Sequence, residues 1–212
     1  FKNTITNITF GTGFEYKQDL FFNPLLVFEF EELETNSSAS STLKKQDGNY
    51  NNLKLDYNLL YDKRNKIFKP SDGYYSNFSQ KLPVISNDYS IYNSYDFKAY
   101  HKLSDNMVGS ISYHMSAINS LEGGDVRVSE RINLSSRKLR GFKPGKIGPK
   151  DNNDYIGGNY AAAFTAATTL PSLLPDLDSV DFGIFIDAGN VWGVDYDSSL
   201  DNSKLRSTAG LA

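Results

Sequence analysis

Cysteine is absent from the 212-residue chain, so disulfide bonds and thiolate metal ligands are excluded. Only two histidines occur, His101 and His114, which is too few for a zinc site unless carboxylates contribute. No run of about eighteen apolar residues is present, and this excludes a transmembrane helix. The net charge of -3, with acidic and basic residues mixed along the chain, argues against a nucleic-acid-binding protein.

The chain also lacks a recognisable beginning and end. Its first residues do not have the basic and then apolar segments of a signal peptide. Residues 207–212 end within a strand-like pattern, without a turn or a polar tail. We therefore expect a fragment of a longer protein, in which residues 1–212 form part of one C-terminal barrel domain.

Alternation of apolar and polar residues is the main pattern that is present. In residues 51–62, Leu53, Leu55 and Leu59 fall on one predicted strand face, and Lys54 and Asp56 fall on the other. The same period of two occurs, strongly or weakly, at residues 4–16, 25–33, 74–82, 94–99, 107–117, 180–189 and 204–212, whereas 157–169, which is built of Gly, Ala and Thr, alternates poorly. This pattern predicts about nine strands of roughly nine to twelve residues, long enough for a tilted strand to cross a bilayer.

Composition and connection lengths favour a membrane barrel over a soluble antiparallel sandwich, which is the alternative. The low mean hydropathy of -0.46 fits strands that alternate lipid-facing and lumen-facing residues, and 14 Tyr with 14 Phe fit aromatic girdles. Short turns at one end and long loops at the other are typical of such barrels. The predicted short turns are 17–23, 63–73, 103–106 and 170–179, and they alternate with longer or more polar connections at 34–50, 83–90, 118–156 and 190–203.

The connection 118–156 is too long for a hairpin, and structureless loops of this size usually have a function. It contains Leu139-Arg140-Gly141-Phe142 and Ile147-Gly148-Pro149, and Gly157-Gly158-Asn159 follows it. Glycine and proline at this density predict a fixed path rather than a helix. The basic cluster at 137–146 fits phosphate or lipid headgroups, or, if the loop folds inward, acids on the barrel wall.

These segments, in this order, resemble the sixth extracellular loop and the next strand of BamA-type barrels, which belong to the bacterial surface antigen superfamily. The similarity continues in Phe185-Ile186-Asp187-Ala188-Gly189-Asn190-Val191-Trp192, like the thirteenth strand, and in residues 207–211, like the fourteenth. Residues 57–73 resemble a strand and a periplasmic turn of the same barrel. The resemblance covers most of the chain from about Tyr57 onward, whereas the first 50 residues match only in pattern.

The resemblance implies an all-β, antiparallel transmembrane β-barrel, with this fragment covering about nine strands of a sixteen-stranded barrel. It implies a part in the assembly machinery that folds and inserts outer-membrane proteins, located in the bacterial cell outer membrane. The implied partners are unfolded outer-membrane protein substrates, the lipoproteins of the assembly machine and outer-membrane lipids. No nucleic acid, enzymatic activity, metal or cofactor is expected, since the sequence contains no recognisable catalytic constellation or phosphate loop. The seam strands that handle substrate would lie outside this chain.

Arg140 is the sharpest candidate residue. The resemblance implies that its side chain reaches from the loop into the lumen and pairs with an acid on the wall. The period of two puts Asp187 opposite Ile184 and Ile186, so Asp187 faces the lumen if the isoleucines face lipid. A guanidinium can form a bidentate, charge-assisted pair with such a carboxylate.

The sequence departs from the family pattern at one position near this pair. Family members commonly carry a second acid where this chain has Ala167. Arg140 therefore has one partner fewer, unless Asp181 or another acid replaces it.

Several neighbouring residues are predicted to shape the loop. Gly141 permits the backbone turn between Arg140 and Phe142, and Phe142 is a hydrophobic plug against the lumen wall. The loop-shaping positions on the return to the wall are Gly148, Pro149, Gly157 and Gly158. Trp192 and Tyr196 are predicted to belong to an interfacial aromatic belt.

Two other kinds of outer-membrane protein stay open as alternatives. A two-partner secretion or TamA-type transporter of the same superfamily shares the Arg-Gly-Phe/Tyr loop, and upstream modules would distinguish it. A passive outer-membrane channel would conduct ions whether or not Arg140 is present.

Overall fold

The structure is a computed structural model that describes residues 1–170, 182–201 and 203–212. The helices in the described residues are α1 (Ser41–Lys44) and η1 (Ser198–Leu200), and neither is long or apolar enough to cross a membrane. All other regular elements in these residues are strands. They are β1 (Lys2–Gly11), β2 (Phe14–Lys17), β3 (Leu20–Glu34), β4 (Gly48–Asp62), β5 (Gly73–Ile85), β6 (Ser90–Ser104), β7 (Met107–Ser120), β8 (Lys150–Asp151), β9 (Asp154–Tyr155), β10 (Tyr160–Thr169), β11 (Gly183–Trp192) and β12 (Arg206–Leu211).

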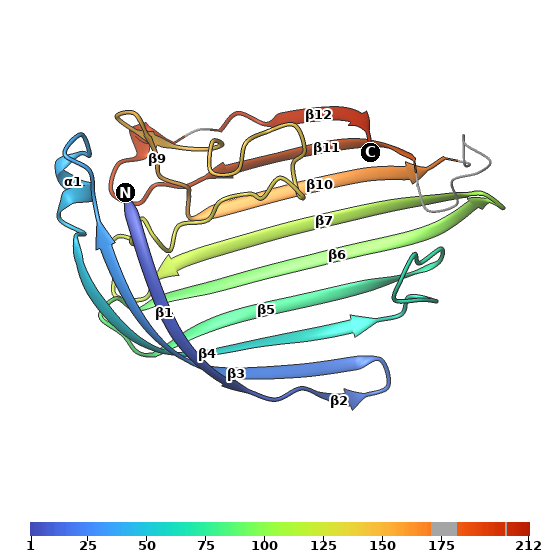
Figure 1. Cartoon of the computed structure of the whole chain (residues 1–212), viewed down its shortest axis with the longest axis horizontal. Coiled ribbons are helices and arrows are strands. Elements are labelled where there is room, and N and C mark those ends of the chain that lie inside the picture. The colour runs from blue at the N-terminus through green and yellow to red at the C-terminus, as the bar shows by residue number, and fades with distance from the viewer. Residues whose placement is uncertain (171–181, 202) are drawn as a thin grey trace.

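Ten of these strands form one antiparallel sheet in the order β1-β3-β4-β5-β6-β7-β10-β11-β12, with β2 paired to β3. Because β1 and β2 follow one another along the same edge of β3, the sheet is nine strands wide, as the sequence pattern predicts. The sheet is strongly curved, and its two end strands, β1 and β12, are not neighbours in it (Figure 1). The open curve is therefore part of a barrel wall rather than a closed barrel.

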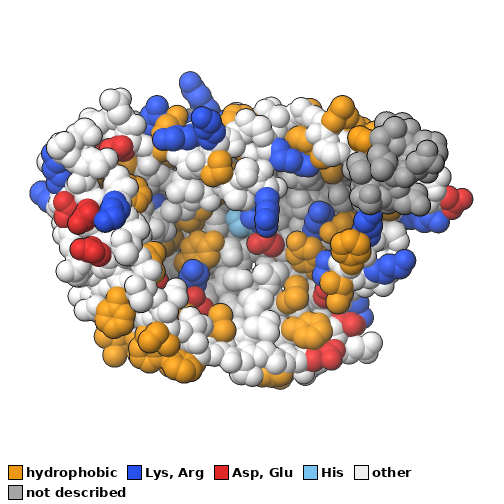
Figure 2. Space-filling view, in the orientation of Figure 1, with side chains coloured by type: hydrophobic (Ala, Val, Ile, Leu, Met, Phe, Trp, Pro, Cys, Tyr) orange, Lys and Arg blue, Asp and Glu red, His pale blue; other side chains and the backbone are white. Residues whose placement is uncertain are grey.

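The two faces of the sheet differ in chemistry because side chains alternate along every strand. On the convex face, apolar residues stand next to one another across strands, such as Phe28 beside Leu53 and Tyr113 beside Phe164. The concave face carries polar and charged residues at the positions in between, including Asp96 and His114. Figure 2 looks onto a hollowed surface of the molecule, where charged side chains lie within and around the hollow.

Several strands are longer than the sequence pattern predicts. β3, β4 and β6 each have 15 residues, rather than nine to twelve. The backbone ladder continues beyond the alternating apolar segments, because pairing needs only N–H and C=O groups and not apolar side chains. The predicted long connection 83–90 is accordingly wrong, since only residues 86–89 lie between β5 and β6. Most of the predicted turn 170–179 lies outside the described residues.

Connections 35–47, 121–159 and 193–205 lie at one end of the sheet, together with the short connection 86–89 (Figure 1). The other end holds the short turns 18–19 and 105–106 and the connection 63–72. The longest connection, residues 121–159, is called the wall loop below, and it contains the short hairpin of β8 and β9. Its apolar residues join the sheet in two buried clusters. The first contains Ile118, Val126, Ile132, Leu134, Leu139, Ile147, Ala161, Ala163 and Val191, and the second contains Leu33, Ala39, Leu43, Val128, Ile156 and Val194.

Candidate functional site

The structure brings Arg140 and Asp187 together, one from the wall loop and one from the middle of β11. The Arg140 guanidinium donates from Nε to Asp187 Oδ2 at 2.8 Å and from NH2 to Oδ1 at 2.7 Å. The backbone N–H of Arg140 also donates to Oδ2, at 3.0 Å. Thr165 on β10 donates its hydroxyl to Oδ1 at 2.8 Å. The Asp187 side chain is fully buried, so these four donors replace the water that its carboxylate has lost.

The sheet register explains why these groups meet. Thr165 pairs with Asp187 across β10 and β11, so both side chains lie on the same face. Phe185, two residues earlier on β11, lies on that face too, and its ring centroid is 3.4 Å from the Arg140 guanidinium carbon. Arginine suits this position because its planar guanidinium can stack on a ring while its edge makes two parallel hydrogen bonds.

Ala167 occupies the wall position beside this pair. It is the register partner of Phe185, so the small side chain stands next to the aromatic ring under Arg140. Among the described residues, Asp187 is the only carboxylate that pairs with Arg140, while Asp181 lies outside them. The resemblance predicts a second acid at position 167. The structure has Ala167 there, and the ring of the neighbouring Phe185 lies against Arg140 instead.

Gly141 and Phe142 continue the contact with the wall. Gly141 has φ +81°, a conformation that costs little only for glycine. A Cβ atom at this position would lie 3.1 Å from the Thr208 hydroxyl oxygen on β12. Phe142 is partly buried and packs against the first apolar cluster. The backbone turn at Gly141 thus lets Arg140 reach β11 while Phe142 packs against the apolar cluster between the loop and the sheet.

The remaining loop-shaping residues lie where the wall loop returns to the sheet. Gly148 has φ +99°, and a Cβ there would lie 2.9 Å from the Val191 Cβ. The next residue, Pro149, is fully buried. Gly157 has φ +70°, and Gly158 lies against the Trp192 backbone. These positions allow the loop backbone to run directly over the end of β11.

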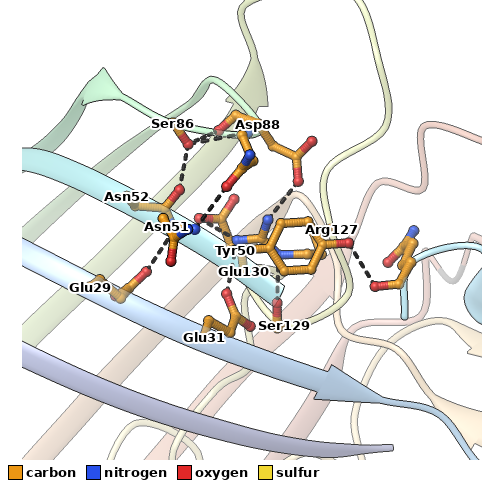
Figure 3. A network of polar contacts seen from close by, with 12 residues as sticks. Glu29, Glu31, Tyr50, Asn51, Asn52, Ser86, Asp88, Arg127, Ser129 and Glu130 are labelled. Carbon is orange, nitrogen blue, oxygen red and sulfur yellow. Dashed lines mark hydrogen bonds and ion pairs between the residues drawn. The ribbon is translucent and has the colours of Figure 1, made fainter. Parts of the chain in front are cut away.

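Arg127 is a second attachment of the wall loop that the sequence reasoning missed (Figure 3). Its NH2 group donates to Glu31 on β3 at 2.9 Å, and NH1 donates to Asp88 in the β5–β6 connection at 2.5 Å. The guanidinium carbon is 3.7 Å from the Tyr50 ring centroid on β4. The Arg127 and Glu31 side chains are each only 2% exposed, so this ion pair is far more buried than Arg140.

Arg131, four residues after Arg127, makes a third attachment. It donates to the backbone carbonyl of Val126 at 3.1 Å and forms an ion pair with Asp195 in the β11–β12 connection. The sequence does carry a signal for both arginines. Arg127 lies between Val126 and Val128, and Arg131 directly precedes Ile132; a basic residue beside apolar ones indicates a buried and paired charge.

The loop carboxylate Asp195 ionises more readily than a free aspartate. Burial opposes its charge, but hydrogen bonds from Asn159 and the Val126 amide, together with Arg131, outweigh burial and hold its pKa below the ordinary value. The neighbouring Tyr196 was predicted to lie in an aromatic belt, and that prediction is wrong. Its ring packs in the second apolar cluster and its hydroxyl donates to Asp151 at 2.9 Å, so burial and this acceptor raise its pKa.

The predicted basic cluster of the wall loop also contacts the sheet. Lys138 donates to Asp96 on β6, and His114 Nδ1 on β7 lies 3.0 Å from the same carboxylate. Both histidines thus lie beside carboxylates, since His101 is 3.7 Å from Asp72. Among the described residues, no group of three or more potential ligands could hold a metal ion.

The arrangement as a whole fixes a long loop to a curved wall. Arg127 and Lys138 attach the wall loop to β3 and β6, Arg140 attaches it to β11, and Arg131 joins it to a neighbouring connection. Phe142 and the glycines set the path between these points. The chemistry available is recognition and mechanical bracing by ion pairs, rather than transfer of a group.

Comparison with known proteins agrees with this architecture. The chain is similar to a BamA structure from Haemophilus ducreyi that lacks POTRA domains 1–3, with a TM-score of 0.84 at 20% identity, covering 99% of this chain and 47% of that one. It is also 30% identical over 149 residues to a SAM50-like protein of Schizosaccharomyces pombe, covering 66% of this chain and 31% of the relative. The chain thus spans less than half the length of either protein.

The similarity to the BamA structure confirms the predicted fold, an antiparallel transmembrane β-barrel fragment. The model of the Omp85 superfamily domain matches residues 2–212, which is nearly the whole chain. The chain belongs to the Omp85 superfamily.

Proposed function

We propose that the protein folds and inserts other β-barrel proteins in the bacterial outer membrane, without enzymatic activity and without a cofactor. The observation that carries this proposal is the Arg140–Asp187 attachment, which holds the wall loop against the inside of an Omp85 barrel wall. The bacterial location rests on the likeness to BamA of Haemophilus ducreyi, while the SAM50-like relative comes from a fission yeast.

The attachments suit a scaffold that must keep its own wall intact. A strand inside hydrocarbon has to keep its backbone groups hydrogen-bonded, so an assembly factor cannot let its wall unravel while it handles an incoming strand. Arg127, Lys138 and Arg140 connect β3, β6 and β11 through one loop. The loop therefore braces strands that are not neighbours in the sheet. Unfolded outer-membrane proteins, assembly-machine lipoproteins and outer-membrane lipids are the proposed partners.

Reconstitution of the full-length protein in vesicles of phosphatidylethanolamine and phosphatidylglycerol tests the proposal. The rate at which a urea-denatured outer-membrane barrel becomes protease-resistant is measured. We expect the protein to raise this rate, Arg140→Ala to lower it several-fold and Arg140→Lys to give an intermediate rate. Arg137→Ala is the matched control, because Arg137 is an exposed arginine of the same loop.

Three results would contradict the proposal. An insertion rate that does not change with the protein present would exclude an assembly role. Steady ion conductance of the same vesicles, equal in the original protein and in Arg140→Ala, would instead indicate a passive channel. Export of a soluble substrate without barrel insertion would indicate a secretion transporter of the same superfamily.

A further inference from the structure

A groove of about 530 Å³ lies on the convex face of the sheet, away from the wall loop. It follows β10, where Ala166 and Thr168 form the floor together with Gly109 of β7. Ile111 stands on one side of the groove, and Ile184 lines the other. The lining is almost wholly apolar.

The strand register shows why the surface is hollowed at this place. One row across the sheet reads Ala99, Ile111, Ala166 and Ile186, and the next row toward the short turns reads His101, Gly109, Thr168 and Ile184. Large and small side chains alternate in the first row, so Ala166 lies in a trough between the two isoleucines.

A row of aromatic residues closes the end of the groove that lies farther from the short turns. Phe97, Tyr113 and Phe164 pair across β6, β7 and β10, one step farther from the short turns. Phe164 is the next outward residue of β10 after Ala166, so its ring stands at the inner end of the trough. The groove thus runs from the membrane edge at the short turns toward the middle of the apolar surface.

The position of the groove decides what occupies it. The convex face carries the continuous apolar rows of a transmembrane barrel, so this surface meets hydrocarbon and not water. Lipid tails are as apolar as isoleucine, so no hydrophobic force holds a chain there. Retention then depends on van der Waals contact, which a trough provides on three sides and a flat surface on only one.

We propose that this groove binds one phospholipid acyl chain and retains that lipid more firmly than the lipids elsewhere around the barrel. The acyl chain lies along β10 with its methyl end toward Phe164, and the headgroup of the same lipid lies near the short turns. The proposal does not rest on the assembly activity, since the floor residues Ala166 and Thr168 take no part in the loop attachments, although Phe185, which lies against Arg140, is also among the lining residues.

Native mass spectrometry of the full-length protein tests the proposal. The protein is taken from vesicles of phosphatidylethanolamine and phosphatidylglycerol into detergent, and the lipids that stay bound are counted. We expect Ala166→Leu, which fills the floor, to retain one lipid fewer than the original protein. Ala162→Leu is the matched control, because Ala162 faces outward on the same strand but does not line the groove. Equal lipid counts in all three proteins would overturn the proposal.

A second measurement leaves the floor of the groove unchanged, in case Ala166→Leu does not fold. Trp192 is the only tryptophan of residues 1–212, so Trp192→Phe, together with Phe in place of any tryptophan outside these residues, provides a background for new fluorescent reporters. Ile184→Trp places a reporter in the groove, and Phe28→Trp places one on the outward face of β3. With trace phospholipid that carries brominated chains in detergent micelles, we expect at least twofold stronger quenching at position 184. Equal quenching at both positions would overturn the proposal.

Discussion

The wall loop is attached to the sheet at two arginines whose surroundings differ. Arg127 is almost completely buried, stacks on Tyr50 and forms ion pairs with three carboxylates, those of Glu31, Asp88 and Glu130. Arg140 is 29% exposed at its side chain and binds a single carboxylate, which is itself fully buried. The residue in the recognisable motif is thus the more accessible of the two, and the residue without a motif is the more deeply buried.

The difference teaches that a motif and a stabilising contact need not coincide. A buried ion pair adds little net stability compared with apolar residues, but removal of one partner leaves an uncompensated charge. The Arg127 attachment should therefore dominate the stability of the domain. The Arg140 attachment is better suited to a role in which the loop contact is adjusted, because the Arg140 side chain stays partly exposed.

The largest expected effect is that of Arg127→Met. It leaves the Glu31 carboxylate buried without its cation, which should lower the free energy of unfolding by about 3–5 kcal/mol. Urea unfolding in lipid vesicles, followed by tryptophan fluorescence, measures the change. Adding Glu31→Gln should recover part of the loss, and Arg137→Met on the exposed part of the loop should change little. An unfolding curve for Arg127→Met that overlays the original one would refute the comparison.

Arg140→Ala should lower the free energy of unfolding by a smaller amount, about 2–3 kcal/mol. Hydrogen bonds between charged groups are lost, but Thr165 still donates to Asp187. A double-mutant cycle with Asp187→Ala isolates the pair. We expect a coupling of about 0.5–3 kcal/mol between the two positions, measured by the same urea unfolding. Arg140→Lys should restore only part of it, since an ammonium cannot form the bidentate pair. Strictly additive losses would show that the pair does not act as a unit.

Gly141→Ala tests whether the backbone conformation next to Arg140 matters for the attachment. The positive φ should cost about 1–2 kcal/mol for any residue with a Cβ. Gly123→Ala is a matched control, because Gly123 has φ +74° in the same loop with nothing within 4 Å of an added Cβ. Gly141→Ala should be the more destabilising, since its Cβ meets the Thr208 hydroxyl, and Thr208→Ala should remove the excess. Equal losses at the two glycines would mean that the approach to β12 does not matter.

The smallest expected effect is a weakening of the Arg131–Asp195 ion pair at low pH. The folded-state pKa of Asp195 lies below the ordinary value of 3.8, so its stabilisation is present above that pH and is lost as pH falls through the folded pKa. Limited proteolysis of the wall loop should therefore become faster at pH 3 than at pH 6. Asp195→Asn should raise cleavage at pH 6 and reduce the difference between the two pH values. If Asp195→Asn shows the same difference in cleavage rate between pH 3 and pH 6 as the original protein, other carboxylates cause that difference.

Much of this architecture could be predicted from single residues and their spacing. Alternation along 51–62 and 180–189 gave the strands and placed Asp187 on the loop-covered face, because strand side chains have a fixed period of two. Strand ends were predicted less well, since the ladder of β6 continues through polar residues to Ser104. The error at Tyr196 has a similar cause, because aromatic residues fit both a membrane interface and a buried loop core.

The sequence by itself determined an antiparallel, barrel-type sheet nine strands wide, the inward direction of Asp187 and the candidacy of Arg140, because these follow from local periodicity and from a motif. Tertiary structure alone decided which partners meet across long separations. Arg127 binds Glu31 over 96 residues, and Phe185 rather than a second acid supports Arg140. No local rule fixes such contacts, because they depend on how the curved sheet and the folded loop bring distant strands together.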